Sequence, residues 1–245
     1  MPEIISIELS ARGRDLLLMV VAHDWATLSG LVLSRLQLDG ILRHRTSLVT
    51  EIHIEASDWR LDALNRSQST RLAAAEASVT LATPNYHASD SQLVALLAAD
   101  GRIGFADLAR LTGRTPATVR RQVARLLATG AVRFRCEISQ ESSRWPICCT
   151  WFCRVDSRHL SETAHDLRSL PEIRGCFSTT GESNLMFIAW ARSVTDLLRI
   201  EKEVTQRQPS LRVLDSAVAL STRKRIGWLL DDHGCAVGDV VTPEF

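Results

Sequence analysis

Arginines gather in one stretch of the chain, where they could bind the phosphates and base edges of a nucleic acid. Residues 90–137 contain eight arginines and four acidic residues, so this stretch carries a net charge of +4, whereas the whole chain carries +1. A guanidinium can donate two parallel hydrogen bonds to a phosphate or a guanine, which an ammonium group cannot do. Because a charged run can also be only a solvated face, its meaning depends on the elements that present it.

The pattern around these arginines predicts short helices joined by a tight turn. Thr112-Gly113-Arg114 is typical of a turn, and Thr115 is a suitable N-cap for the helix that follows. Pro116 fits the first helical position, where its missing N–H costs nothing. Two short helices with such a turn are typical of helix-turn-helix domains that bind DNA. Apolar spacing predicts helices over Asp90–Ala99, Phe105–Leu111 and Pro116 to about Thr129, and then a strand over Val132–Ile138.

The polar face of the last of these helices is the candidate DNA-binding surface. Its N-terminal residues are expected to face base edges, while the surrounding arginines position the protein on the phosphates. We expect Thr115, Ala117, Thr118 and Arg121 at the bases, and Arg102, Arg114, Arg120 and Arg125 at the backbone.

A second candidate site is the tract Thr179-Thr180-Gly181-Glu182-Ser183-Asn184, between two predicted strands. Its backbone N–H groups could bind a small polar ligand, and the strands Ile173–Thr179 and Asn184–Ala191 would supply a partly apolar wall. The alternative is a simple hairpin turn, which glycine and asparagine favour on conformational grounds alone.

Other chemistries find no support in the residue spacing. The six cysteines include no C-x2-C pair and the histidines no metal-binding doublet, so no metal site is predicted. Cys149, Trp151 and Cys153 share one strand face, which indicates reduced cysteines packed in a core. Nucleophile, phosphate-loop and dinucleotide signatures are absent, so we predict neither an enzyme nor a cofactor.

An internal repeat organises the sequence. Adding 169 to a residue number aligns Pro2-Glu3-Ile4 with Pro171-Glu172-Ile173 and Trp59 with Trp228, with no gap. We call residues 1–66 the first repeat and residues 144–232 the second repeat. Trp151, Trp190 and Trp228 are interpreted as core or interface residues rather than ligand-stacking groups.

The sequence of the second repeat predicts the element order βαββαβ. That of the first repeat predicts only the last four elements of this order: β, β, α and β. The expected strands and helix of the first repeat are Glu3–Leu9, Leu16–Ala22, Trp25–Leu38 and Arg43–Ile54. The fold class is therefore α+β: a winged-helix or helix-turn-helix domain plus a ferredoxin-like βαββαβ domain, preceded by a partial second copy of it. The predicted boundaries are 1–66 for the partial domain, 67–89 for a connecting helix (Ser67–Ala77) and linker, 90–138 for the helix-turn-helix, 144–232 for the ferredoxin-like domain and 233–245 for a tail.

Composition places the chain among globular proteins. Of its 245 residues, 45% are hydrophobic and 23% charged, which excludes a disordered chain. No apolar run reaches the length of a membrane span, and acids stand where a signal peptide needs bases. We expect a cytoplasmic protein with no membrane partner.

Residues 88–230 resemble a complete module of the Lrp/AsnC family of bacterial and archaeal transcription regulators. The resemblance rests on the segment from Asp90 to Val132 and on Gly181-Glu182-Ser183-Asn184, which is similar to the family's Gly-x-x-Asp/Asn loop. Residues 2–62 resemble half of another module, which suggests the subgroup with tandem modules. Arg12-Gly13-Arg14-Asp15 departs from the pattern because it lacks the Thr-Thr-Gly run, which puts a ligand site there in doubt.

This resemblance implies a regulator that binds double-stranded DNA in a sequence-specific way. It further implies a small-molecule effector, such as an amino acid, bound near the loop 179–184, and a homodimer or higher homo-oligomer formed through the sheet domains. One alternative is an enzyme similar to sirohaem decarboxylases, which share this architecture and use pocket histidines; His159 and His165 are the candidates here. Another is a DNA-free, metabolite-sensing partner of a full-length regulator.

The start of the first repeat raises a separate expectation. Met1 aligns with Leu170, so the strand and helix that open the second repeat have no counterpart in residues 1–66. Either another chain completes the half-domain across a dimer, or Met1 is an internal methionine of a longer reading frame that encodes a further helix-turn-helix upstream.

Overall fold

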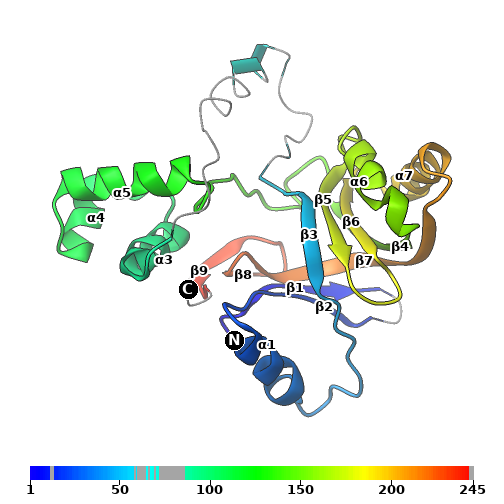
Figure 1. Ribbon diagram of the computed structural model, residues 1–245, viewed down its shortest axis with the longest axis horizontal. Coiled ribbons are helices and arrows are strands. Elements are labelled where there is room, and N and C mark those ends of the chain that lie inside the picture. The colour runs from blue at the N-terminus through cyan, green and yellow to red at the C-terminus, as the bar shows by residue number, and fades with distance from the viewer. Residues whose placement is uncertain are drawn as a thin grey trace.

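The computed structural model describes residues 1–11, 14–57, 59, 65, 67, 68, 70, 71 and 86–242. The connecting helix predicted over Ser67–Ala77 lies mostly outside these residues. Within them, a small helical unit lies on one side of an antiparallel sheet, and the helices of the second repeat lie on the other side (Figure 1).

The second repeat forms the centre of the sheet. Its strands have the order β7-β4-β6-β5, all antiparallel, which is the ferredoxin-like arrangement predicted from the sequence. Both helices cover one face, where their apolar residues pack against Cys149, Trp151 and Cys153. The elements are β4 (Ile147–Arg154), α6 (Leu160–Leu167), β5 (Ile173–Thr179), β6 (Leu185–Ala191), α7 (Val194–Arg207) and β7 (Arg212–Arg225).

The first repeat extends this sheet at both edges. Its first strand pairs with β7 and its last strand with β5, so the full order is β2-β1-β7-β4-β6-β5-β3. Ile4, Leu31 and Leu36 form a small separate core under the helix of this repeat. The elements are β1 (Ile4–Ser10), β2 (Leu16–Val20), α1 (Trp25–Gly30), a π-helical turn over Leu31–Arg35, and β3 (Val49–Ile54).

The helical unit has its own core. Helices α3 (Ser91–Ala99), α4 (Phe105–Thr112) and α5 (Pro116–Ala128) match the predicted helices to within two residues at each end. The apolar faces of these helices pack together in one cluster. This packing stabilises the unit, because helices this short are not stable in isolation. The buried members are Leu93, Leu97, Leu108, Ala109, Val119, Val123 and Leu126.

Three elements differ from the prediction. The helix expected over Trp25–Leu38 ends at Arg35, and the strand expected over Arg43–Ile54 begins only at Val49. The strand expected over Val132–Ile138 is not formed, because no strand in the described part of the chain pairs with this segment. Ion pairs hold the segment instead, from Arg133 to Glu55 at 3.2 Å and from Arg174 to Glu137 at 2.6 Å.

The C-terminal part continues the sheet. The segment predicted as a tail contains β9 (Ala236–Val240), which pairs with β8 (Trp228–Leu230), and β8 in turn pairs with the end of β7. Among the described residues, no helix is long and apolar enough to span a membrane.

Tryptophans gather on the sheet face opposite α6 and α7. Because neighbouring residues of a strand point to opposite faces, Cys148 lies on this side while Cys149 lies among the helices. Trp190 and Trp145 are buried here, and Trp59 of the first repeat packs edge-on against both, with ring centroids 5.0 and 6.4 Å away. The Arg174 guanidinium lies 4.2 Å from the centre of the Trp190 ring.

Candidate nucleic-acid interface and ligand loop

The start of α5 is built by local sequence. Gly113 ends α4 in the left-handed conformation, with φ of 66°, which a side chain would strain. Thr115 then caps α5 by accepting a hydrogen bond from the backbone N–H of Thr118 at 3.3 Å. Pro116 takes the first helical position, as predicted. The turn therefore fixes how the N-terminal half of α5 is presented to solvent.

Two of the predicted phosphate-binding arginines are instead bonded within the protein. Arg125 Nη2 lies 2.6 Å from Asp90 Oδ2, and Asp90 is completely buried. Arg114 donates to the backbone carbonyl of Ser89 at 2.7 Å and to Gln122 Oε1 at 3.0 Å. These arginines tie α5 to the start of α3, which the sequence analysis missed because their partners lie on an earlier element.

Asp90 is the centre of this connection. Burial alone would raise the pKa of its carboxyl, but the hydrogen bonds from Arg125 and from the His87 backbone N–H outweigh burial and hold the pKa below its usual range. Its Oδ1 atom is buried without a hydrogen-bond partner in the described part of the chain. The carboxylate thus stays charged and keeps the Arg125 guanidinium in place.

The other predicted DNA-contacting residues lie on the surface. Arg120, Arg121 and Ala117 are exposed on α5, and Thr115 and Arg102 are exposed beside it. Thr118 is half-buried by its contact with the cap. The Arg120 guanidinium lies 5.3 Å from the centre of the Phe105 ring on α4, which orients it along the outer face. The surface offered to solvent therefore contains three arginines, small side chains and hydroxyls.

The loop 179–184 is tightly bonded to its surroundings. Asn184 accepts a hydrogen bond from the Val155 N–H at 2.9 Å and donates to the Val155 carbonyl at 2.8 Å, so it clamps the end of β4. Thr179 Oγ1 donates to the Ser183 carbonyl at 3.0 Å. Thr180 exchanges backbone and hydroxyl hydrogen bonds with Leu48 of the first repeat. These residues therefore shape the loop rather than face an open site.

The tip of the loop has remaining hydrogen-bond donors. Within the described residues, the backbone N–H groups of Gly181, Glu182 and Ser183 donate to no protein acceptor. Arg154 donates to the carbonyls of Gly181 and Glu182 at 3.2 and 3.3 Å, and it also lines a shallow hollow of about 400 Å³ with Arg212. Sequence reasoning missed Arg154 and Leu48, because neither lies in the motif.

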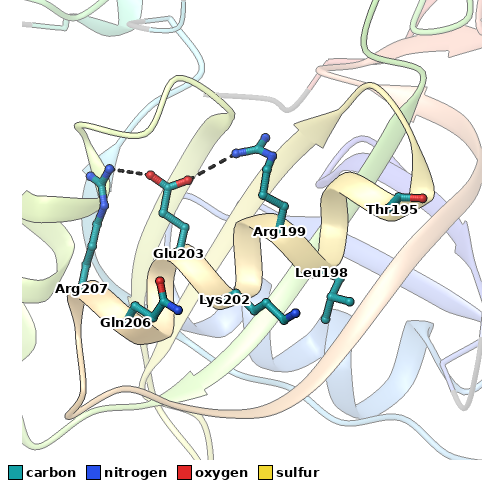
Figure 2. Close-up of a pocket in the computed structure, with 7 residues that line it drawn as sticks. All are labelled: Thr195, Leu198, Arg199, Lys202, Glu203, Gln206 and Arg207. Carbon is teal, nitrogen blue, oxygen red and sulfur yellow. Dashed lines mark hydrogen bonds and ion pairs between the residues drawn. The ribbon is translucent and has the colours of Figure 1, made fainter.

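A second shallow hollow, on α7, offers less to a ligand. Figure 2 shows that Thr195, Leu198, Arg199, Lys202, Glu203, Gln206 and Arg207 line it, and all of them belong to α7. Arg199 and Arg207 both bond to Glu203, so three of these charges are already matched. Because no described residue outside α7 lines this hollow, a small ligand there would stay largely in water.

The residues required for other chemistries lie apart. His159 and His165 are exposed on α6 or just before it, and neither lines either hollow. The described residues contain no group of three or more histidines, cysteines or acids placed to hold a metal. Burial raises the pKa of the Cys149 and Cys176 thiols to about 12, which keeps them as inert core groups.

Two family matches correspond to the two units of the structure. Residues 88–127 match the AsnC-type helix-turn-helix domain, and residues 150–229 match the Lrp/AsnC ligand binding domain. Residues 88–127 and 150–229 thus carry the two domains of Lrp/AsnC-type regulators. The resemblance predicted from the sequence is thus confirmed, and the matched domains are those of regulators rather than of enzymes.

Relatives agree with this family. The HTH-type transcriptional regulator FL11 of Pyrococcus furiosus is 24% identical over 98 residues, which are 40% of this chain and 65% of FL11. This match therefore spans slightly less than two thirds of that relative. An uncharacterized HTH-type transcriptional regulator of Pyrococcus abyssi is 23% identical over 136 residues, 55% of this chain and 86% of that protein.

Solved structures confirm the fold. The leucine response regulatory protein LrpA of Mycobacterium tuberculosis has a TM-score of 0.52 and 24% identity, over 58% of this chain and 99% of that one. A feast or famine regulatory protein from the same organism, complexed with L-methionine, has a TM-score of 0.51 and 24% identity, over 56% of this chain and 97% of that one. The helix-turn-helix and βαββαβ domains therefore have the α+β fold that was predicted.

Proposed function

We propose that this protein binds double-stranded DNA through α5 and regulates transcription in response to a small metabolite. The observation that carries the proposal is the division of the arginines around α5. Arg114 and Arg125 brace the helix from inside, while Arg120 and Arg121 remain exposed beside Thr115, Ala117 and Thr118. A braced helix that presents free guanidinium groups and small side chains fits the major groove.

The DNA-binding test compares Arg121→Ala with Arg158→Ala. Both variants remove one positive charge, but Arg158 lies in the turn just before α6 and pairs with Asp156. Arg121→Ala should weaken binding to a selected operator by about 1–3 kcal/mol and relax preference at one base pair. Arg158→Ala should bind like the original protein. Affinity is measured by mobility shift at several salt concentrations, and a folded Arg120→Ala/Arg121→Ala double variant with unchanged affinity would contradict the proposal.

For the effector, we propose a small metabolite with a carboxylate, such as an amino acid, at the tip of the loop 179–184. The supporting observations are the N–H groups of Gly181, Glu182 and Ser183, which donate to no acceptor among the described residues, and the nearby guanidinium of Arg154. The bound L-methionine of the mycobacterial regulator belongs to that protein, but its chemistry agrees with this class of ligand.

A thermal-shift screen of the twenty amino acids and common keto acids tests the effector site. A ligand that binds only the folded state should raise Tm in proportion to its occupancy. Gly181→Glu should abolish the shift, whereas Gly238→Glu should keep it, since Gly238 also has a positive φ but lies in the β8–β9 hairpin. A screen without any stabilising compound would reject the site.

Assembly and location follow from the same proposal. Two such chains, joined through their sheet domains as a homodimer or a higher homo-oligomer, would present two α5 helices to a two-fold symmetric operator. The protein would act in the cytoplasm. Sedimentation velocity and DNA footprinting together test this arrangement.

A further inference from the structure

The two repeats pair with each other through equivalent strand edges. Under the offset of 169, β1 is the counterpart of β5, and β3 is the counterpart of β7. The ladder between β1 and β7 and the ladder between β3 and β5 are therefore equivalent, with the roles of the two repeats reversed. In the ladder β1–β7, Ile7 faces Lys224. In the ladder β3–β5, Cys176 faces Ile54. The counterpart of Cys176 is Ile7, and that of Ile54 is Arg223, the neighbour of Lys224. The two ladders thus agree to within one residue, which relates the repeats by an approximate two-fold axis.

This symmetry identifies an unoccupied strand position. In the second repeat β4 lies between β6 and β7. The counterparts of β6 and β7 are β2 and β3, so the equivalent of β4 would lie between β2 and β3. Among the described residues, no strand occupies that position, and no helix of the first repeat corresponds to α6.

The backbone beside this position lacks a ladder. The first half of β7, from Arg212 to Ala219, pairs with β4, and the part from Ala219 to Arg225 pairs with β1. In the first repeat, β3 is the counterpart of the second half of β7. Residues 43–48, which are the counterparts of the first half (212–217), form no strand. Because backbone N–H and C=O groups need partners, a segment without a neighbouring strand does not hold strand geometry alone.

Apolar side chains around the position are exposed where their counterparts are buried. Leu42 is 100% exposed, whereas its counterpart Leu211 is 5% exposed and lies in the main core. Leu16 on β2 is 47% exposed, whereas Leu185 is fully buried. The outer edges of β2 and β3, with which no described strand pairs, lie beside exposed leucines and form a surface suited to pairing with a further strand.

We propose that the first repeat is an acceptor for a strand followed by an amphipathic helix, with the chemistry of Ile147–Leu167. The strand inserts between β2 and β3 and forms antiparallel ladders with both. The register follows from β4: the residue that corresponds to Cys149 lies between Val20 and Val49, the counterparts of Ala189 and Val218. The helix covers β1, since α6 packs against its counterpart β5.

The observations favour this occupant over edge pairing between two copies of the whole chain. Edge pairing would add a neighbour to β2 or to β3, but it would bring no helix over the first repeat. A strand with its helix satisfies both edges at once and supplies the cover that Leu211 has in the second repeat. The inserted strand then joins the two ends of the order β2-β1-β7-β4-β6-β5-β3 into a closed ring.

The test duplicates residues 144–170 directly ahead of Pro2 in the full chain. Leu170 precedes Pro171, the counterpart of Pro2, so the repeat itself defines the junction. The fused segment should raise Tm by several degrees and slow hydrogen exchange at least about tenfold in residues 16–20 and 43–50. The control fusion carries proline at both positions that correspond to Cys149 and Trp151, which removes ladder donors, and should show neither effect.

A second arm avoids dependence on the folding of the fusion. A labelled synthetic peptide of residues 144–170 is added to the unmodified chain, and binding is followed by fluorescence anisotropy and hydrogen exchange. Binding with protection of 16–20 and 43–50 supports the acceptor site. Unchanged exchange in both arms would overturn it. The proposal would also be overturned if the unmodified chain formed a dimer that already protected residues 16–20 and 43–50, and if the fusion formed the same dimer.

Discussion

The two repeats of the sheet module share their apolar pattern but differ in where that pattern is buried. Ile4 and its counterpart Ile173 are both buried, at 7% and 4% exposure, and so are Leu31 and Ile200 under their helices. The repeats diverge at positions that β4 and α6 cover in the second one, such as Leu211 and Leu185. Burial is therefore set by the neighbours that a position receives rather than by the residue that occupies it.

The loops of the two repeats show the same contrast. Asn184 ties its loop to the end of β4 through both backbone groups of Val155. Its counterpart, Asp15, is exposed and follows a segment without the Thr-Thr-Gly run. With no equivalent of β4 to bind among the described residues, the loop of the first repeat has no such clamp.

The largest expected difference is between Leu211→Ala and Leu42→Ala. Removing the buried Leu211 side chain should lower the free energy of unfolding by about 2–5 kcal/mol, because it leaves a cavity in the core. The same change at the exposed Leu42 should stay within about 0.5 kcal/mol. Urea unfolding measures both. Equal losses would mean that Leu42 is covered in solution, and the contrast between the repeats would fail.

A smaller difference is expected between Asn184→Ala and Asp15→Ala. The first change leaves the N–H and the carbonyl of Val155 without partners and should cost about 1–3 kcal/mol. The second removes an exposed side chain and should cost almost nothing. Differential scanning calorimetry of the two variants compares the loops directly, and a stable Asn184→Ala protein would argue that the clamp is dispensable.

The smallest effect concerns an acid that both repeats use in the same way. Glu3 bonds to Arg35, and its counterpart Glu172 bonds to Arg199, although the two arginines occupy different helical positions. The hydrogen bond from Arg35 lowers the pKa of Glu3. This stabilisation is therefore present above the ordinary glutamate pKa and is lost as the pH falls through the lowered value.

Glu3→Gln isolates that contribution. The variant should be less stable near neutral pH by under about 1 kcal/mol, since the pair is partly exposed, and should equal the original protein in strong acid. Unfolding midpoints across an acid series give the comparison. Glu182→Gln, which changes a more exposed acid paired with Arg45, is the comparison and should change stability less.

The helix-turn-helix was predictable because its signals are local. Thr115, Pro116 and Gly113 define the turn by their own conformational preferences, and apolar spacing defines the helices around it. The internal roles of Arg114 and Arg125 were not predictable, since their partners at Ser89 and Asp90 come from another helix.

The sheet was predictable within each repeat but not between them. Strand residues alternate, which indicates strands, but alternation does not say which edges meet. The prediction of a strand over 43–54 was wrong in its first half because strand propensity supplies no neighbour. The loop motif likewise located 179–184, whereas the contacts of Thr180 with Leu48 join residues more than a hundred positions apart.

The tryptophan cluster gives the protein an intrinsic optical reporter. Trp59 of the first repeat packs edge-on against both Trp145 and Trp190 of the second repeat. Indole rings this close couple their electronic transitions, and near-ultraviolet circular dichroism depends on such fixed packing. Separation of the repeats, or withdrawal of the segment that leads to the helical unit, would therefore change the spectrum of the unlabelled protein in real time.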